Sequence, residues 1–206
     1  EAQLDARTDL TDEEKKAAKA DAQARATAAK AAIDNATTNA TVDSAKTSGV
    51  ADVESVNPQA SQKKNDAKNA VDEALKAKEA AIDARADLTD EEKTAAKADA
   101  KAKADAAKTA IDNATTNAGV DQAKVNGTTE VNNVNPTPVA KPAAKKAIDA
   151  ALKAKNDAID ANNDLTAEEK AKAKQEAQNK ADAAKTAIDN ATTNAAVEQA
   201  KADGAT

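Results

Sequence analysis

The feature that most constrains this chain is an internal repeat. The segment Asp-Leu-Thr-Asp-Glu-Glu-Lys at 9–15 returns unchanged at 87–93 and, with one substitution, at 164–170. A second segment, Ile-Asp-Asn-Ala-Thr-Thr-Asn-Ala, returns unchanged and starts at Ile33, Ile111 and Ile188. Both segments recur at the same two intervals, of which the second is one residue shorter than the first. We therefore predict consecutive copies of one supersecondary unit.

The repeat divides the chain into three parts. We predict a partial repeat over residues 1–57, which holds the end of a first helix followed by a second and a third helix. A complete three-helix repeat follows over residues 58–135, and residues 136–206 form a third repeat that is truncated in its third helix. Because both ends fall inside a repeat, we expect a piece excised from a longer tandem array.

The composition excludes several classes of function. The chain has no Phe, Trp, Tyr, His, Cys or Met, so it lacks a thiolate nucleophile, the commonest general base, and aromatic rings that stack on nucleic-acid bases. The net charge of -6 also argues against nucleic acid as a partner, and no apolar run reaches the ~20 residues of a membrane span. Large apolar residues are scarce, which would favour disorder, but Ala, Lys, Glu and Gln are strong helix formers. We therefore expect a helical chain with thin cores.

The first helix of the complete repeat is predicted to begin near Pro58, with Asn57 as its N-cap, because proline suits the first helical position. The single-residue difference in repeat length should lie between this proline and Val71, in a loop or helix start. The core-facing residues of this helix recur at helical spacing and are Val71, Ala74, Leu75, Ala81 and Ile82.

Each second helix is predicted to begin with a capping box, in which a threonine and a glutamate three residues later bond to each other's backbone N–H. The pairs are Thr11/Glu14, Thr89/Glu92 and Thr166/Glu169. The core face of the middle copy is almost all alanine and comprises Ala96, Ala100, Ala107, Ile111 and Ala114. Such a face should let neighbouring helices approach more closely than the usual spacing of about 8–10 Å.

The third helix is predicted to start near Thr116 or Asn117, and its apolar stripe passes through a glycine. The stripe comprises Val120, Ala123, Gly127, Val131 and Val134, and Gly49 has the same position in the first repeat. Two interpretations remain open: a continuous helix with a close neighbour at the glycine, or a helix that ends near Lys124 and leaves a loop. We favour the continuous helix because the last two valines keep the helical phase.

Three helices joined by short turns predict an all-α fold of antiparallel three-helix bundles, each about 40 Å long. With an odd number of helices the chain leaves a bundle at the opposite end, so tandem copies should extend end to end as an elongated rod. The junction at Asn57 and Pro58 should be tight, whereas three prolines within 136–142 should give a semi-rigid, extended connector. The partial repeat at 1–57 is expected to fray unless its helices find cover elsewhere.

Three stretches of the middle repeat, Leu88–Lys93, Asp105–Ala118 and Val120–Lys124, together with Gly127, resemble a known repeat. They are similar to the alanine-rich tandem repeat of unknown function in large Gram-positive cell-wall-anchored surface proteins of the Ebh and SasC type. The resemblance covers essentially the whole chain. It implies a helical bundle fold, an extracellular location, and a place in the stalk between an N-terminal adhesive region and a C-terminal wall anchor.

The leading hypothesis for function is a structural stalk or spacer that projects a distal binding region from the cell wall. Adjacent repeats of the same chain are then its partners. The alternative is a helical-bundle module that binds a host matrix or serum protein, or self-associates between cells in aggregation and biofilm formation. Binding hot spots favour Trp, Tyr and Arg, so a chain without aromatics and with few arginines fits the spacer better.

No catalytic, cofactor-binding or metal-binding residue is predicted, and neither a cofactor nor an enzyme activity is expected. Paired carboxylates occur at Glu13/Glu14, Glu91/Glu92 and Glu168/Glu169. Adjacent helix residues do not face each other, however, and the capping box explains the second member of each pair. The sequence contains no nucleophile with an oriented base and no Asp-x-Asp-x-Asp-Gly calcium loop.

Overall fold

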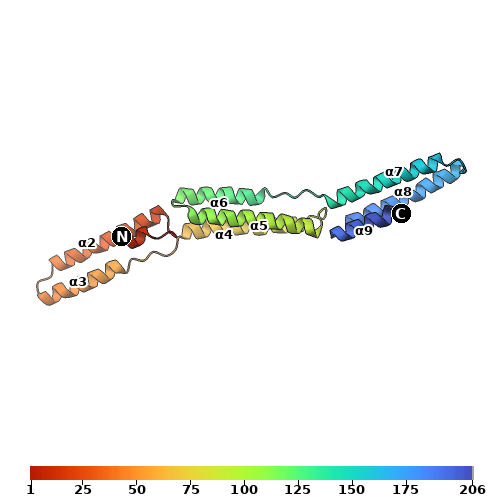
Figure 1. Ribbon diagram of the computed structural model, residues 1–206. Coiled ribbons are helices and arrows are strands. Elements are labelled where there is room, and N and C mark those ends of the chain that lie inside the picture. Colours follow the sequence, from red (N-terminus) through yellow and green to blue (C-terminus); the bar gives the residue numbers. More distant parts are fainter. Residues whose placement is uncertain (206) are drawn as a thin grey trace. The chain divides into compact units, whose positions relative to one another are not determined.

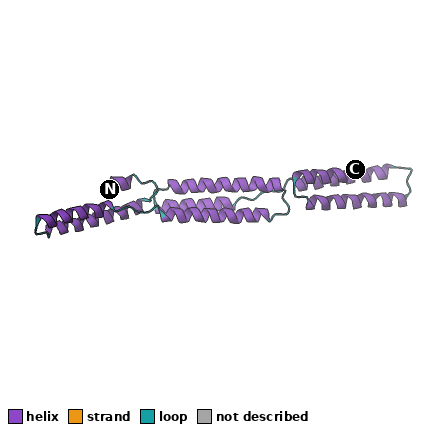
Figure 2. Ribbon diagram, turned by 90° about the horizontal axis from the view of Figure 1, so that it is seen from below, coloured by secondary structure: helices purple, strands orange, loops and turns teal. Residues whose placement is uncertain are grey.

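The computed structural model describes residues 1–205, and this part of the chain contains helices and no strand (Figure 1, Figure 2). The helices are α1 (Ala2–Asp5), α2 (Asp12–Asp34), α3 (Asn39–Glu54), α4 (Gln62–Asp83), α5 (Asp90–Asn113), α6 (Asn117–Asn132), α7 (Ala140–Ala161), α8 (Ala167–Asn190) and α9 (Asn194–Ala205). The first helices of the repeats are α1, α4 and α7, the second are α2, α5 and α8, and the third are α3, α6 and α9. The predicted all-α fold built from bundle repeats is confirmed.

Each second helix begins at its predicted capping box. The Thr11 hydroxyl accepts a hydrogen bond from the Glu14 N–H at 3.3 Å, and the Glu14 carboxylate accepts one from the Thr11 N–H at 2.8 Å. The same reciprocal pair is formed by Thr89 with Glu92 and by Thr166 with Glu169. These pairs satisfy backbone donors that the first helical turn cannot satisfy by itself.

The chain divides into two compact units, and the division runs through α4 and α5. Unit 1 comprises residues 1–75 and 102–131, and unit 2 comprises residues 76–101 together with the chain from residue 132 onward. Each unit contains a hydrophobic core and one complete junction between consecutive repeats.

The two cores use equivalent positions of the repeat. In unit 1, helices α4, α5 and α6 bury Ala67, Val71, Ala104, Ala107, Ile111, Val120 and Val131. In unit 2, the core of α7, α8 and α9, which lie side by side in Figure 1, comprises Ala144, Ile148, Ala181, Ala184, Ile188, Ala191 and Val197. The predicted alanine-rich face of the second helix is confirmed, and the structure adds Ala104 to it.

The third helix of the middle repeat runs through Gly127, which confirms the continuous-helix interpretation. A Cβ atom at Gly127 would lie only 2.2 Å from the Cβ of Ala107 in α5. The other repeats have the same close contact, between Gly49 and Ala29 and between Gly204 and Ala184. Glycine is therefore required here by the close approach of the second and third helices, because a further methyl group would overlap the alanine.

The start of the first helix differs from the prediction. Helix α4 begins at Gln62 and not near Pro58. Its cap is the Ser61 hydroxyl, which accepts a backbone N–H of the first turn at 3.2 Å. Asn57 does not cap the helix, because its side-chain oxygen accepts a hydrogen bond from Arg7 of the preceding repeat.

Two smaller predictions are also wrong. Pro142 lies in the first turn of α7, where a missing N–H costs no helical hydrogen bond, so the second connector ends at Val139. Ala81 does not belong to the core face, because it is exposed, whereas its neighbour Ile82 is buried. Successive helix residues point about 100° apart, so only one of the two can face the core.

The first repeat buries less of its apolar surface than the other two. Ile33 and Val42 are half-buried, whereas the equivalent Ile111 and Val120 of the middle repeat are fully buried. Helices α2 and α3 pack on each other, and α1 packs on α2. The fraying of residues 1–57, the repeat boundaries at residues 58 and 136, and the end-to-end rod stay predictions.

Candidate functional site: the joints between repeats

A recurring polar site joins each repeat to the next. It starts from the loop between the first and second helices and includes the first turn of the second helix. We call these segments linking surface 1 (residues 7–14), linking surface 2 (residues 85–92) and linking surface 3 (residues 162–169). In unit 1, linking surface 1 contacts the start of the middle repeat and forms the first joint. In unit 2, linking surface 2 contacts the start of the third repeat and forms the second joint.

An arginine in each joint binds the connector that leads into the next repeat. The Arg7 guanidinium donates to both carboxylate oxygens of Asp9 at 2.6 Å. It also donates to the Asn57 side-chain oxygen and to the Pro58 carbonyl, each at 3.2 Å. The equivalent bonds of the second joint run from Arg85 to Asp87, Asn135 and Pro136. Because the guanidinium has a rigid fork geometry, these bonds fix the direction in which the connector leaves.

The arginines also change the acidity of their partners. Hydrogen bonds from the Arg7 guanidinium hold the pKa of Asp9 below its ordinary value. Those from Arg85 do the same to the pKa of Asp87. Both carboxylates are therefore charged at neutral pH, and each joint contains one short Arg–Asp ion pair.

A buried lysine connects the two repeats at the centre of each joint. Lys64, at the start of α4, is only 4 % exposed, and its ammonium donates to the Thr8 carbonyl at 3.1 Å and to the Asp112 carbonyl at 2.8 Å. Lys141 is also 4 % exposed and donates to the equivalent carbonyls of Ala86 and Asp189, both at 2.8 Å. In each joint the first carbonyl, of Thr8 or Ala86, belongs to the preceding repeat. The second, of Asp112 or Asp189, lies in the last turn of the second helix of the lysine's own repeat, where the helix dipole favours a cation.

The first turns of α2 and α5 each contact the turn between the second and third helices of the next repeat. The Asp12 N–H donates to the Thr115 carbonyl at 2.7 Å, and the Asn117 N–H donates to the Glu13 carboxylate at 3.0 Å. Hydrogen bonds from the backbone N–H groups of Glu13 itself and Asn117 lower the pKa of Glu13. The second joint repeats both contacts, from Asp90 to Thr192 at 2.7 Å and from Asn194 to Glu91 at 2.9 Å.

The capping glutamates contact the next repeat with their second carboxylate oxygen. Glu14 accepts the Ser61 hydroxyl at 2.8 Å, whereas Glu92 accepts the backbone N–H groups of Val139 and Ala140 at 2.8 and 2.9 Å. Burial would raise the pKa of Glu92, but these two hydrogen bonds and the one from the Thr89 N–H outweigh it and lower that pKa. The two joints thus differ in the donor to the capping glutamate, which is a serine hydroxyl before α4 and two backbone N–H groups at the start of α7.

Sequence reasoning missed the arginines and lysines of the joints. The arginines carried a signal in their rarity, since the chain has three, Arg7, Arg25 and Arg85, and two of these hold equivalent positions. Lys64 and Lys141 carried none, because lysine occurs throughout the helices and nothing local marks these two as buried.

Two of the three carboxylate pairs considered as catalytic candidates, those at the starts of α2 and α5, have structural partners in the joints. Glu14 and Glu92 complete capping boxes, and Glu13 and Glu91 accept backbone N–H groups of the next repeat. Within residues 1–205, no group of three or more acidic side chains could hold a metal ion. None of the helices described is long and apolar enough to cross a membrane. The absence of catalytic, cofactor and metal residues stays a prediction.

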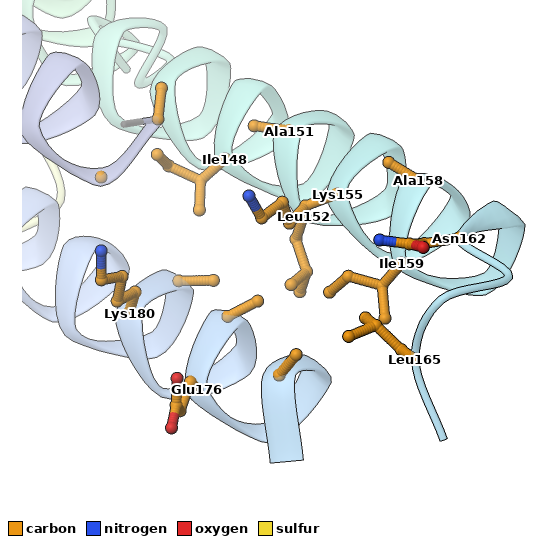
Figure 3. Close-up of a pocket in the computed structure, with 15 residues that line it drawn as sticks. Ile148, Ala151, Leu152, Lys155, Ala158, Ile159, Asn162, Leu165, Glu176 and Lys180 are labelled. Atoms are coloured by element: carbon orange, nitrogen blue, oxygen red, sulfur yellow. The ribbon is translucent and has the colours of Figure 1, made fainter. Parts of the chain in front are cut away.

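Unit 2 also contains an open apolar groove of about 550 Å³ between α7 and α8 (Figure 3). Its apolar lining includes Ile148, Leu152, Ile159 and Leu165, and Figure 3 shows Glu176 and Lys180 on the α8 side. The charged residues that line it are Lys155, Glu176 and Lys180.

The sequence pattern of a family described as Domain of Unknown Function (DUF1542) matches the chain three times, over residues 1–61, 63–139 and 140–206. Repeats of this family occur in Gram-positive surface proteins such as those of the Ebh and SasC type, which confirms the resemblance noted in the sequence. No curated protein and no solved structure matches the chain significantly.

Proposed function

We propose that this chain, which belongs to the DUF1542 family, is a structural spacer of a Gram-positive surface protein, a stalk segment that projects a distal adhesive region from the cell wall. The observation that carries this proposal is the repetition of the joint. Two successive pairs of repeats are connected by the same arginine, lysine and helix-end contacts. Bundles on free linkers would need no such contacts.

The joints support a stiff spacer because they connect helix ends directly. In each joint the second helix of one repeat begins against the turn between the second and third helices of the next. The arginine and the buried lysine add contacts on the connector side, so a joint cannot bend without breaking several hydrogen bonds. Restricting bending at every joint keeps the two ends of a long array apart, which is what a spacer must do.

We further infer an extracellular location, with attachment to the wall through another region of the protein. The repeat family supports the surface location. We also infer that the repeats have no enzymatic role. The paired glutamates of α2 and α5 already have hydrogen-bond partners in the joints, and the groove between α7 and α8 lacks a catalytic arrangement.

The second candidate function is binding, either to a host matrix or serum protein or between cells. Apolar side chains line the groove between α7 and α8, and such a partner could cover them (Figure 3), although in the middle repeat the equivalent face is already covered by α6 with Val131. The two functions are separated by replacing the repeats in the whole surface protein with unrelated helical bundles of equal total length. A spacer survives this replacement with adhesion intact, whereas a binding module loses its binding.

Small-angle X-ray scattering of the chain tests the spacer directly. A compact globule should give a radius of gyration of about 17 Å and an unfolded chain about 49 Å. Some 2.6 bundles of about 40 Å each, placed end to end, should give about 30 Å. A radius at the compact value would mean that the repeats fold back on one another, and the spacer proposal would have to be abandoned.

A further inference from the structure

Linking surface 3 has the same paired glutamates and the same backbone groups as the other two linking surfaces, but no residue of another repeat binds it within residues 1–205. Among residues 1–205, no hydrogen bond reaches the Ala167 N–H or the Glu168 carboxylate. Their counterparts Asp12, Asp90, Glu13 and Glu91 all bond to the next repeat. The capping threonine changes accordingly: Thr11 and Thr89 are 0 % exposed, whereas Thr166 is exposed.

The two occupied joints define what binds such a surface. The partner presents a lysine in the first turn of a first helix, whose ammonium reaches a backbone carbonyl of the linking loop. The partner also presents the turn before its third helix. A carbonyl of this turn accepts the first N–H of the helix in the linking surface, and a backbone N–H near the turn donates to the glutamate of the linking surface. The linking surface must therefore offer a backbone carbonyl for the lysine, a backbone N–H and a carboxylate. Linking surface 3 has these groups at Asn163, Ala167 and Glu168, respectively.

We propose that linking surface 3 is a docking surface for the start of a further repeat of this same family. The partner binds as a helical bundle end, with its first-helix lysine against the Asn163 carbonyl. The turn before its third helix packs against Ala167 and Glu168. The inference follows from continuity with the first and second joints, which are built from the same groups.

Linking surface 3 differs from the other two at Asn162, which replaces an arginine, and at Ala167, which replaces an aspartate. Asn162 stands where the first two linking surfaces have Arg7 and Arg85, and its side-chain oxygen accepts the Asp164 N–H at 2.9 Å. The third joint therefore forms without the arginine bonds to the connector. We expect docking at linking surface 3 to be weaker than at the other two, because the two arginine hydrogen bonds that reach the connector, to Asn57 and Pro58 in the first joint, are missing.

The chain as it stands provides the first measurement. Amide hydrogen exchange of Asp12 and Asp90 reports on the two occupied joints, and exchange of Ala167 reports on linking surface 3. We expect the Ala167 amide to exchange roughly tenfold faster, or more, than the other two after correction for intrinsic rates. Equal protection of all three amides would overturn the proposal, because protection would then not depend on a docked repeat.

The second measurement adds the partner. Since Thr206 aligns with Thr129, a second copy of residues 130–206 fused after Thr206 continues the repeat in register. In this extended chain the Ala167 amide should become protected, to a level below that of Asp12 and Asp90. If it stays unprotected while the helical amides of the added copy are protected, the added repeat is folded but undocked, and the proposal is wrong.

Two variants of the extended chain separate docking from general stabilisation. Lys141→Met in the added copy alone should return the Ala167 amide to fast exchange, and Lys145→Met in the same copy is the matched control that should leave it protected. Asn162→Arg should slow Ala167 exchange further, towards the value of Asp90. An unchanged Ala167 amide with Lys141→Met would contradict the proposed contact.

This inference rests on the proposed spacer function only for its biological setting, and the two can fail separately. An undocked third joint in a chain with the radius of gyration of the end-to-end arrangement would leave the spacer standing and remove the docking surface. A docked third joint in a chain with the radius of a compact globule would do the reverse.

Discussion

The first and second joints contain the same contacts but start the next repeat differently. In the first joint, Ser61 caps α4 and its hydroxyl donates to Glu14. In the second, α7 has no side-chain cap, and two backbone N–H groups of its start donate directly to Glu92. The connectors also differ by one residue, since Lys64 follows Pro58 by six positions and Lys141 follows Pro136 by five.

The comparison shows which parts of a joint are specified by side chains and which by the backbone. Ser61 stands three positions before Lys64, but the residue three positions before Lys141 is Pro138. Proline has neither a hydroxyl nor an N–H, so the role of Ser61 cannot be repeated there. Two backbone N–H groups at the start of α7, which have no acceptor within the helix, replace it and donate to Glu92, because a helix N-terminus offers donors wherever a carboxylate approaches. A one-residue deletion is thus absorbed without loss of the glutamate contact.

The largest expected effect comes from the feature that the joints share. Lys64→Met and Lys141→Met each keep the apolar part of a buried side chain but leave two backbone carbonyls without their charged donor, at a cost of about 3 kcal/mol. Exchange of the Asp12 amide, in the first case, and of the Asp90 amide, in the second, should accelerate roughly a hundredfold.

The controls are Lys68→Met and Lys145→Met, which remove partly exposed ion pairs to the side chains of Asp112 and Asp189. They should change exchange by less than about threefold. If the two buried lysines differ strongly in effect, the joints do not share a common centre.

The next largest effect should separate the joints. Glu92→Ala removes the acceptor of two backbone N–H groups of the next repeat, whereas Glu14→Ala removes the acceptor of one hydroxyl. Both lose a capping box, so the difference isolates the contact across the joint. Asp90 exchange in the first variant should increase roughly tenfold more than Asp12 exchange in the second.

A third variant acts on the first joint alone. Ser61→Ala removes the cap of α4 and the bond to Glu14, and should accelerate Asp12 exchange roughly fivefold, in line with a cap worth about 1 kcal/mol. Val139→Ala is the matched change in the second joint. The Val139 side chain is 65 % exposed and its N–H is kept, so Asp90 exchange should not change.

The smallest effect is the response to acid. The pKa values of Asp9, Asp87 and Glu92 are lowered in the folded chain, so their stabilisation is complete above the ordinary values of 3.8 and 4.5 and is lost as the pH falls through the lowered values. Corrected exchange of Asp12 and Asp90 should rise roughly two- to threefold between about pH 6 and pH 3. Joints that tighten on acidification would contradict this sign.

Glu92→Gln refines the same titration. It should remove part of the pH dependence from the second joint and leave that of the first joint unchanged. A first joint that also loses pH dependence would show that the two joints open together.

Much of the fold followed from local patterns. The capping boxes at Thr11, Thr89 and Thr166 and the continuous helix through Gly127 were predictable because spacing along one helix determines them. The start of α4 was not, because Asn57 bonds to Arg7, which lies fifty positions earlier in the sequence. Local propensity favours the helix start at the proline, and a contact between repeats overrides it.

The site was less predictable for the same reason. The lysine contacts of each joint end on backbone carbonyls, which every residue type provides, so no side-chain pairing appears in the sequence. Burial of Lys64 depends on two segments that approach only after the bundles have formed. In the sequence, a buried lysine such as Lys64 therefore looks the same as a lysine on a solvent-exposed helix face.

The use of backbone carbonyls as acceptors also bears on how such arrays change over generations. The carbonyls that receive Lys64 and Lys141 belong to Thr8 and Ala86, and Asn163 stands at the third position, so the side chain there is free to vary. Neighbouring repeats therefore need no matched pair of side chains at this contact. Recombination between repeat-coding segments of a gene can add or delete whole units without creating a mismatched lysine contact, and the length of the encoded protein can change in steps of one repeat.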